Sequence, residues 1–278
     1  MPDSAFEKFC EEHLSELDEL AGRFGDYEPV DVDIARLRLW LKQFGAQHRI
    51  LALKLAKILS YYAVDRLNGV MPTLYKLIEQ QIAGEDAKPA EVFYVPWGRT
   101  GESGEHIVRC FRLVNRLQRS GNRFINRAEV IERTVRLENP VVFFLDDFVG
   151  TGKQVCEGWR DIVSQIVPER VKTYLAVVAA FKEGVDCIES ETPLRVLAVH
   201  TLGPRLQLME SACTSFSRGD KNTIKRYCED AGNQPLGFGD RGLLVSFAYG
   251  TPNNSISVIR GSEKQRPWLG LLPLWEDL

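Results

Sequence analysis

Two adjacent carboxylates, Asp146 and Asp147, follow the apolar run VVFFL (141–145) and stand just before the glycine-bearing turn GTGK (150–153). Glycine lets a backbone approach phosphate oxygens closely, and the N–H groups of a turn that enters a helix bind anions. Acids beside such a loop would repel a bare polyphosphate, but they can accept hydrogen bonds from sugar hydroxyls or hold a divalent cation. The stretch therefore predicts a ligand that carries both a sugar and a phosphate, such as a ribose 5-phosphate unit.

A nucleoside-triphosphate P-loop is the competing interpretation of this stretch, because Gly152-Lys153 resembles the end of GxxxxGK[ST]. The pattern fails at two positions. Asp147 stands where the first glycine belongs, and Gln154 stands where a Ser or Thr should hold magnesium. An acid inside a loop that binds a triphosphate is electrostatically unfavourable, so a P-loop is the weaker hypothesis.

The elements around the motif indicate an α/β protein. Apolar residues recur at spacings of three, four and seven over 4–24 and 31–82, which predicts helices. Apolar strands are then expected at 91–98, 141–145, 172–181 and 194–200, separated by helices at 104–119, 128–137, 152–166 and 183–190. Continuous apolar strands that alternate with helices predict a parallel sheet covered on both faces.

Three regions are expected along the chain. Residues 1–88 form a helical N-terminal region, 89–204 an α/β core with the parallel sheet, and 205–278 an irregular α+β extension packed on that core. The extension is predicted to contain a helix at 220–231 and a strand at 243–249. Ligands of open parallel sheets bind beyond the carboxyl ends of the strands, which is where the acid pair and the turn stand.

Composition limits the classes of partner. The 278 residues carry a formal net charge of -3, which argues against nucleic-acid binding over the whole surface and leaves a local basic groove open. The six cysteines are scattered without zinc-type spacing, so free thiols in a reducing compartment are expected. The chain has no signal-peptide pattern and no apolar run of about 20 residues, which predicts a cytoplasmic protein without a membrane span.

The run of four apolar residues, two acids and a short Thr/Gly-rich loop resembles the phosphoribosyl-binding signature of type I phosphoribosyltransferases. This resemblance implies an α/β phosphoribosyltransferase-like core in which Asp146 and Asp147 contact the ribose hydroxyls and hold Mg²⁺ through water. It also implies that the 5-phosphate is bound by Gly150, Thr151, Gly152 and Lys153. Gly150 and Lys153 depart from the usual form of the signature, which has threonine at both positions.

A second glycine-rich stretch, PWGRTGESGE (96–105), follows the first predicted strand of the core, where these transferases bind the diphosphate. The resemblance implies that the diphosphate is contacted by Gly98, Arg99, Thr100 and Ser103. An exposed turn in which Ser103 caps a helix is an equally open interpretation.

A narrower resemblance joins the helical N-terminal region, the LDDFVGTGK form of the motif and the late TPNNS segment (251–255). Together they are similar to phosphoribosyltransferase-like proteins of bacterial conflict systems, which implies a role in defence against phage or mobile elements, with protein partners from the same operon. Asn253 and Asn254 are then candidates for a base-recognising or lid segment. A plain turn between strands is the alternative for them.

Two functions from different classes follow. The first is a phosphoribosyltransferase that binds a phosphoribosyl pyrophosphate-like ligand with Mg²⁺ and transfers the group at the anomeric carbon. The second is a noncatalytic sensor or regulatory module that binds a nucleotide or a nucleic-acid end in the same pocket. The loop substitutions favour the second and the intact acid pair favours retained ligand contact. The acceptor and the oligomeric state stay open.

Overall fold

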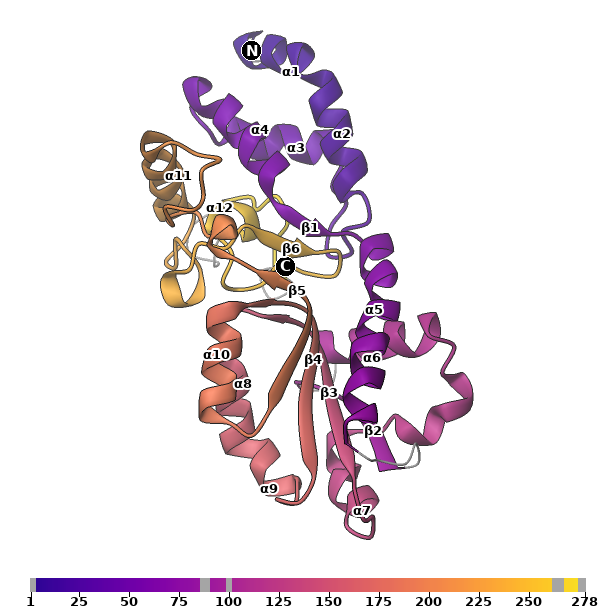
Figure 1. Cartoon of the computed structure of the whole chain (residues 1–278). Coiled ribbons are helices and arrows are strands. Elements are labelled where there is room, and N and C mark those ends of the chain that lie inside the picture. Colours follow the sequence, from indigo (N-terminus) through magenta and orange to yellow (C-terminus); the bar gives the residue numbers. More distant parts are fainter. Residues whose placement is uncertain (1–3, 86–90, 99–101, 262–267, 275–278) are drawn as a thin grey trace. The chain divides into compact units, whose positions relative to one another are not determined.

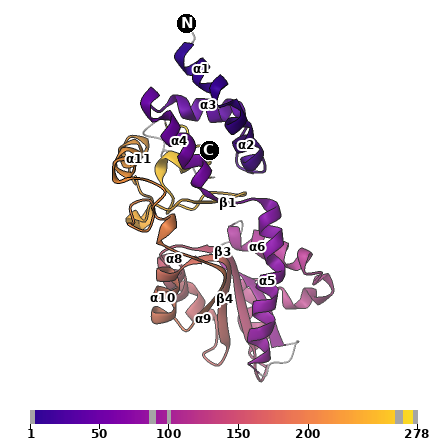
Figure 2. The same ribbon diagram turned by 45° about the horizontal axis from the view of Figure 1, so that its top comes forward.

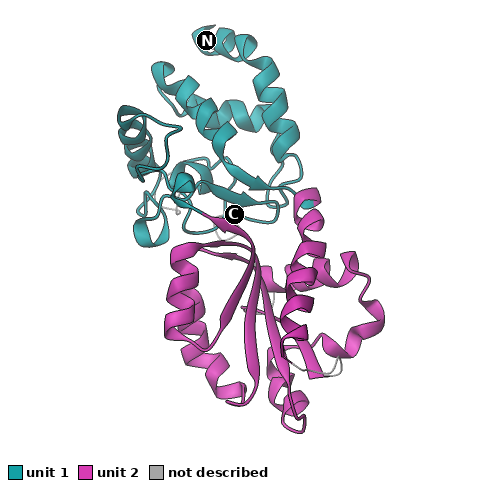
Figure 3. Ribbon diagram, viewed as in Figure 1, with its two compact units in different colours: residues 1–64, 203–278 teal, residues 65–202 magenta. Residues whose placement is uncertain are grey.

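The computed structural model describes residues 4–85, 91–98, 102–261 and 268–274, and divides the chain into two compact units. Unit 1 combines residues 1–64 with 203–278, and unit 2 is the continuous segment 65–202 (Figure 3). This grouping differs from the three expected regions, because the N-terminal helices and the C-terminal extension belong to one unit. The long helix after residue 64 belongs to the α/β unit.

Unit 2 contains a four-stranded parallel sheet in the order β2-β3-β4-β5. Its strands are β2 (Val92–Pro96), β3 (Val141–Val149), β4 (Lys172–Phe181) and β5 (Arg195–Leu202). The predicted α/β class with a parallel sheet is thereby confirmed. β3 is longer than expected and continues through both acids to Val149, because Asp146 and Phe148 pair with Val177 and Ala179 of β4.

Helices cover both faces of this sheet. They are α5 (Val64–Ala83), α6 (Ser103–Val114), η3 (Gln118–Arg123), η4 (Arg127–Glu129), α7 (Val130–Thr134), α8 (Lys153–Gly158), the π-helical turn η5 (Trp159–Val163), α9 (Ser164–Ile166) and α10 (Lys182–Glu191). In both views α5 and α6 lie on one side of the sheet, and α8 to α10 lie on the other (Figures 1 and 2). On the α6 side, the Tyr94 ring of β2 lies 5.2 Å from the Phe111 ring.

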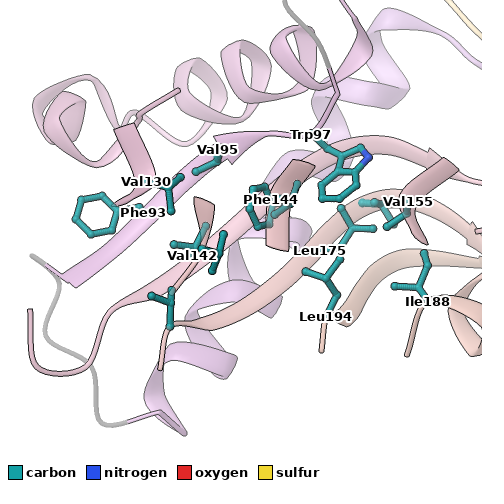
Figure 4. Packing of buried hydrophobic residues seen from close by; sticks show 14 of the residues in the cluster. Phe93, Val95, Trp97, Val130, Val142, Phe144, Val155, Leu175, Ile188 and Leu194 are labelled. Atoms are coloured by element: carbon teal, nitrogen blue, oxygen red, sulfur yellow. The ribbon is translucent and has the colours of Figure 1, made fainter. Parts of the chain in front are cut away.

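Side chains along β2 and β3 alternate between the two faces of the sheet, and those on the face opposite α6 form a hydrophobic core. Phe93, Val95 and Trp97 point to the same side as Val142 and Phe144, as expected for a side-chain period of two. Figure 4 shows these side chains packed with Val155 of α8 and Ile188 of α10. Burial of this apolar surface stabilises the α/β unit by about 25 cal/mol per Å² and fixes β3 and its acids relative to α8 and α10.

Unit 1 contains most of the remaining helices and a two-stranded parallel sheet. Its elements are α1 (Ser4–Glu12), α2 (Leu14–Phe24), α3 (Ile34–Lys42), η1 (Ala46–His48), α4 (Arg49–Ile58), β1 (Ser60–Tyr62), η6 (Pro204–Leu206), α11 (Arg218–Ala231), η7 (Phe238–Asp240), β6 (Val245–Phe247) and α12 (Ser257–Arg260). The predicted helix over 31–82 is wrong at β1, which pairs with β6. The Tyr62 and Phe247 rings stack at 4.8 Å, so a distant segment decides the local structure.

Hydrogen bonds between residues that are far apart in the sequence hold unit 1 together. The Trp40 indole N–H donates to the Val258 carbonyl at 2.8 Å, and Arg36 Nη2 donates to the Gly270 carbonyl at 2.6 Å. A buried carbonyl needs such a donor, because leaving it unsatisfied costs about 1–3 kcal/mol. The first and last parts of the chain therefore fold as one body. Among the described residues, no helix has the length and apolarity required to span a bilayer.

Candidate functional site

The acid pair lies in the carboxyl-terminal half of β3. Asp146 and Asp147 are each only 9% exposed. Asp146 Oδ1 accepts two hydrogen bonds, one from the Ser103 hydroxyl at 2.8 Å and one from the Asp147 backbone N–H at 2.9 Å. Ser103 is the first residue of α6, so this bond ties the start of that helix to the acid pair.

Burial raises the pKa of the Asp146 carboxyl well above its usual range, and the neighbouring Asp147 carboxyl raises it further. The pKa of Asp146 is lowered in part by hydrogen bonds from the Ser103 hydroxyl and the Asp147 backbone, and not by a basic side chain. A buried carboxyl beside a second acid is costly to ionise, so these surroundings favour the protonated form of Asp146, and a cation or additional hydrogen-bond donor would favour its ionisation.

The predicted phosphate loop connects β3 to α8 and has a backbone that requires glycine. Gly152 has φ +78°, and a Cβ built on it would lie 2.6 Å from the Gly184 carbonyl oxygen. A Cβ on Gly184, in the first turn of α10, would lie 2.2 Å from the Gly150 carbonyl oxygen. The loop therefore rests directly on the start of α10, which removes side-chain bulk from its supporting side.

The other two loop residues are more accessible. Thr151 is half-buried, and Lys153 is exposed at the first position of α8. The Cys156 backbone N–H donates to the Gly152 carbonyl at 3.0 Å and closes the first helical turn. The loop thus carries a hydroxyl and an ammonium group within three residues, on a backbone fixed at Gly152. Gly184 was not predicted from the sequence, since its only signal is a glycine early in a helix that follows a strand.

The predicted diphosphate segment is only partly described. Gly98 has φ +90° in the turn after β2, while Arg99 and Thr100 lie outside the described residues. Ser103 is not the cap of α6. The capping position is Glu102, and the Ser103 hydroxyl binds Asp146. The structure therefore joins Ser103 to the acid pair, a contact that the sequence did not predict.

Gly104 is a further residue that sequence reasoning missed. A Cβ on Gly104 would lie 2.0 Å from the Trp97 carbonyl oxygen and 2.8 Å from its backbone nitrogen. Glycine here lets the start of α6 pack against the end of the β2 segment. That close approach supports the position of Ser103 and, through it, of Asp146.

Asn253 and Asn254 belong to unit 1, and the acid pair belongs to unit 2. The Asn254 side chain donates to the Phe238 carbonyl at 2.9 Å, and the Asn253 carbonyl accepts from the Phe238 N–H at 2.9 Å. Both residues thus stabilise a turn within unit 1. Asn253 is exposed, and the base or lid role stays a prediction.

A cavity of about 560 Å³ lies beside α6 within unit 2. Its lining includes Pro96, Glu105, Arg109, Arg112, Phe124 and Asn126 and does not include the acid pair. Arg112 lies over the Phe124 ring at 5.3 Å, so part of its positive charge is already engaged. The cavity includes the two end residues of the predicted diphosphate segment, Pro96 and Glu105, and lies along α6.

A parallel sheet, a desolvated acid pair and an adjoining glycine loop define an open α/β protein with a glycine turn at a strand end, where ligands of such sheets usually bind. The family model PRTase-CE, which describes a phosphoribosyltransferase-like family, matches residues 37–274, and the chain belongs to this family. The resemblance to the phosphoribosyltransferase-like family is thereby confirmed. A search of curated proteins finds no match for the chain.

Two solved structures are similar to part of the chain. Orotate phosphoribosyltransferase from Aeropyrum pernix shares 16% identity, covers 50% of this chain and 76% of its own, and has a TM-score of 0.32. The protein TT1426 from Thermus thermophilus shares 20% identity, covers 36% of this chain and 45% of its own, and has a TM-score of 0.20.

Proposed function

We propose that the protein binds a phosphoribosyl pyrophosphate-like ligand together with Mg²⁺ at the acid pair and the adjoining loop. The observation that carries this proposal is the desolvated pair Asp146 and Asp147, joined to α6 through Ser103 and followed at once by the glycine loop. Membership of a phosphoribosyltransferase-like family supports the same ligand class.

Each part of the site has a role in this proposal. Asp146 and Asp147 accept hydrogen bonds from the ribose hydroxyls, which offer the donors that a buried acid pair needs. The backbone of the 150–153 loop binds the 5-phosphate, with the Thr151 hydroxyl and the Lys153 ammonium as additional donors. The segment with Gly98, Arg99 and Thr100 is assigned to the diphosphate.

The donor set fits Mg²⁺, because two adjacent carboxylates offer oxygen ligands and magnesium binds through few carboxylates while keeping several waters. Asp146 and Asp147 are the residues that would hold the ion through water. Bound there, Mg²⁺ supplies charge neutralisation for a diphosphate group. The Ser103 bond to Asp146 Oδ1 orients this carboxyl group within the pair.

In the catalytic version of this proposal, the protein transfers the phosphoribosyl group to an acceptor. Displacement at the anomeric carbon passes through an oxocarbenium-like state, which requires positioning and charge stabilisation more than a strong base. Once ionised, the acid pair accepts hydrogen bonds from the ribose hydroxyls and so orients the sugar ring, while the loop holds the phosphate end. The acceptor is not specified by these residues.

The noncatalytic alternative uses the same site to sense a nucleotide or a nucleic-acid end. Gly150 and Lys153, at positions where the signature usually has threonine, favour this interpretation, because they alter the loop and leave the acid pair intact. The N-terminal helices and the TPNNS segment support a role in bacterial defence, with partner proteins from the same operon. The free cysteines support a reducing compartment such as the cytoplasm.

Calorimetric titration with phosphoribosyl pyrophosphate and Mg²⁺ tests the site, with ribose 5-phosphate and inorganic phosphate as partial ligands. We expect saturable heat in the wild type and its loss in Asp146→Asn/Asp147→Asn. The exposed Asp161→Asn serves as the control for loss of a carboxylate. Because burial raises the pKa of Asp146, binding that favours its ionised form should release protons, and the heat should then depend on the ionisation enthalpy of the buffer.

The outcomes separate the alternatives. Absence of heat in the wild type, or equal heat in the double variant, contradicts the ligand assignment. Binding with pyrophosphate release in the presence of one of a panel of bases identifies a transferase, and binding without release favours the sensor. For the defence role, plaque counts with the neighbouring genes expressed beside wild type or the double variant should differ. Equal counts contradict it.

A further inference from the structure

The fold brings together three side chains that the sequence keeps apart. Cys156 lies in α8, while Cys187 and Glu191 lie four residues apart on one face of α10. The two sulfur atoms are 3.7 Å apart, and Cys187 Sγ lies 3.6 Å from Glu191 Oε1. One ligand atom from each of the three residues lies within 4.8 Å of the others. Both cysteines are free thiols.

These separations match a tetrahedral soft metal. Zinc bonds of about 2.3 Å to sulfur place two thiolates about 3.8 Å apart, and an oxygen bond of about 2.0–2.2 Å places sulfur and oxygen about 3.6 Å apart. A disulfide requires the sulfurs to approach to about 2.05 Å. The Cys156–Cys187 and Cys187–Glu191 separations are therefore compatible with a metal site. The ligand atoms of Cys156 and Glu191 lie within 4.8 Å of each other, so side-chain adjustment without movement of the helices is enough for all three to bind one ion.

The surroundings of the cluster also suit a cation. Arg160 Nη2 lies 3.5 Å from Glu191 Oε2, so the second carboxylate oxygen is held by a cation while Oε1 is directed at Cys187. Such outer contacts orient metal ligands. Two thiolates and one carboxylate carry three negative charges, which Zn²⁺ and Arg160 together balance. Cys156 is buried, whereas Glu191 is exposed, so the fourth position opens to solvent.

We propose that Cys156, Cys187 and Glu191 bind a thiophilic divalent cation of the zinc class, with water as the fourth ligand, and thereby clamp α8 to α10. Binding displaces the protons of the two thiols, which pass to the solvent. Soft sulfur ligands select against Mg²⁺ and Ca²⁺, so this site is distinct in chemistry from the acid pair.

The proposed metal site is in direct contact with the glycine loop. Cys156 follows Gly152 by one helical turn, and its N–H donates to the Gly152 carbonyl. A Cβ built on Gly152 would lie 3.2 Å from the Cys187 Cβ. A metal that fixes Cys156 against Cys187 therefore fixes the support on which the loop rests, whatever ligand the acid pair binds.

Titration of the full chain with Co²⁺ tests the site, after reduction by a phosphine that does not bind the metal. We expect one equivalent of Co²⁺ per chain, with the sulfur-to-cobalt charge-transfer absorption of a thiolate site and its displacement by Zn²⁺ but not by Mg²⁺. Cys156→Ser and Cys187→Ser should each abolish one-equivalent binding. Glu191→Gln should keep the sulfur absorption and weaken affinity by at least about tenfold, because loss of a residue that only orients a metal ligand already costs about 10–100-fold.

The matched control is Cys110→Ser, which removes a partly exposed cysteine of α6 and should leave the titration unchanged. Cys187 and Glu191 are not fully buried, so their variants should retain the wild-type circular dichroism spectrum and keep the test valid if Cys156→Ser does not fold. No charge-transfer absorption in the wild type, or unchanged binding in Cys187→Ser, overturns the proposal. A Cys156–Cys187 disulfide in the oxidised protein, combined with no cobalt uptake after reduction, overturns it as well.

Discussion

The two units differ in how the chain builds them. Unit 2 is one continuous segment whose four strands follow each other in sequence and in space, whereas unit 1 combines the first 64 residues with the last 76, 203–278. In unit 2 the acids, the loop and the helix after them are consecutive. In unit 1 a three-residue strand finds its partner beyond the whole of unit 2. Local sequence patterns therefore describe unit 2 well and unit 1 poorly.

The largest effect is expected when the chain is divided into separately expressed segments. Residues 65–202 contain their whole sheet and core, and their length lies within the usual range for a domain. We expect this fragment to fold alone with a cooperative urea transition and dispersed amide resonances. Residues 1–64 alone lack β6 and the Val258 carbonyl that binds Trp40, so they should remain unfolded until 203–278 is joined to them. Cooperative unfolding of 1–64 by itself would contradict the assignment of two units.

The next largest effect is expected at Gly184. Gly184→Ala forces a Cβ against the Gly150 carbonyl oxygen, 2.2 Å away, so the backbone must shift. Overpacking of this kind typically costs about 1–3 kcal/mol of unfolding free energy, and it should also lower affinity for ribose 5-phosphate. The control is Gly22→Ala in α2, where an added Cβ has no other atom within 4 Å. This substitution should stabilise the helix by about 0.5–1 kcal/mol. Urea denaturation measures both, and equal effects of the two substitutions would refute the contact.

Ser103→Ala removes the hydroxyl that donates to Asp146. Asp146 Oδ1 keeps the Asp147 backbone N–H as its second donor. We therefore expect a loss of about 1–2 kcal/mol in unfolding free energy, the usual net contribution of one hydrogen bond to a carboxyl group, together with weaker ligand binding. Ser164→Ala is the control, because the Ser164 hydroxyl donates to the Arg160 carbonyl at an exposed position. If the two variants are equally stable, Ser103 does not position the acid pair.

The pH dependence of stability is the smallest expected effect. The native pKa of Asp146 is raised by burial and by Asp147, so the proton contributes stability that is complete below the unfolded pKa and is lost as pH rises through the native pKa. Asp146→Asn imitates the protonated form. It should match the wild type at low pH and exceed it above the native pKa, by about 0.5–2 kcal/mol, as stabilising substitutions at functional sites do.

Urea unfolding at several pH values measures this difference. The control variant Asp161→Asn, at an exposed position, should show no gain in unfolding free energy over the wild type that grows with pH. A variant Asp146→Asn that is less stable than the wild type at high pH would show that the ionised carboxylate is stabilised by a partner in the free protein.

The sequence by itself determined the parts that depend on neighbours along the chain. Apolar runs and intervening amphipathic segments predicted the parallel sheet of unit 2, because strand and helix periods are local properties. The order of apolar run, acid pair and glycine turn predicted the candidate site for the same reason. Even there the strand extends beyond its expected end, since Phe148 pairs with Ala179 of β4.

Only the tertiary structure decided which distant residues meet. The hydrogen bond from Ser103 to Asp146, the contact of Gly184 with Gly150 and the pairing of β1 with β6 each join separate elements. The cluster of Cys156, Cys187 and Glu191 belongs to the same class, because thirty-one positions separate its two cysteines in the sequence and no linear metal motif spans them. Packing of α8 against α10 brings these thiols together, and packing depends on side-chain shapes from the whole unit, which no local pattern contains.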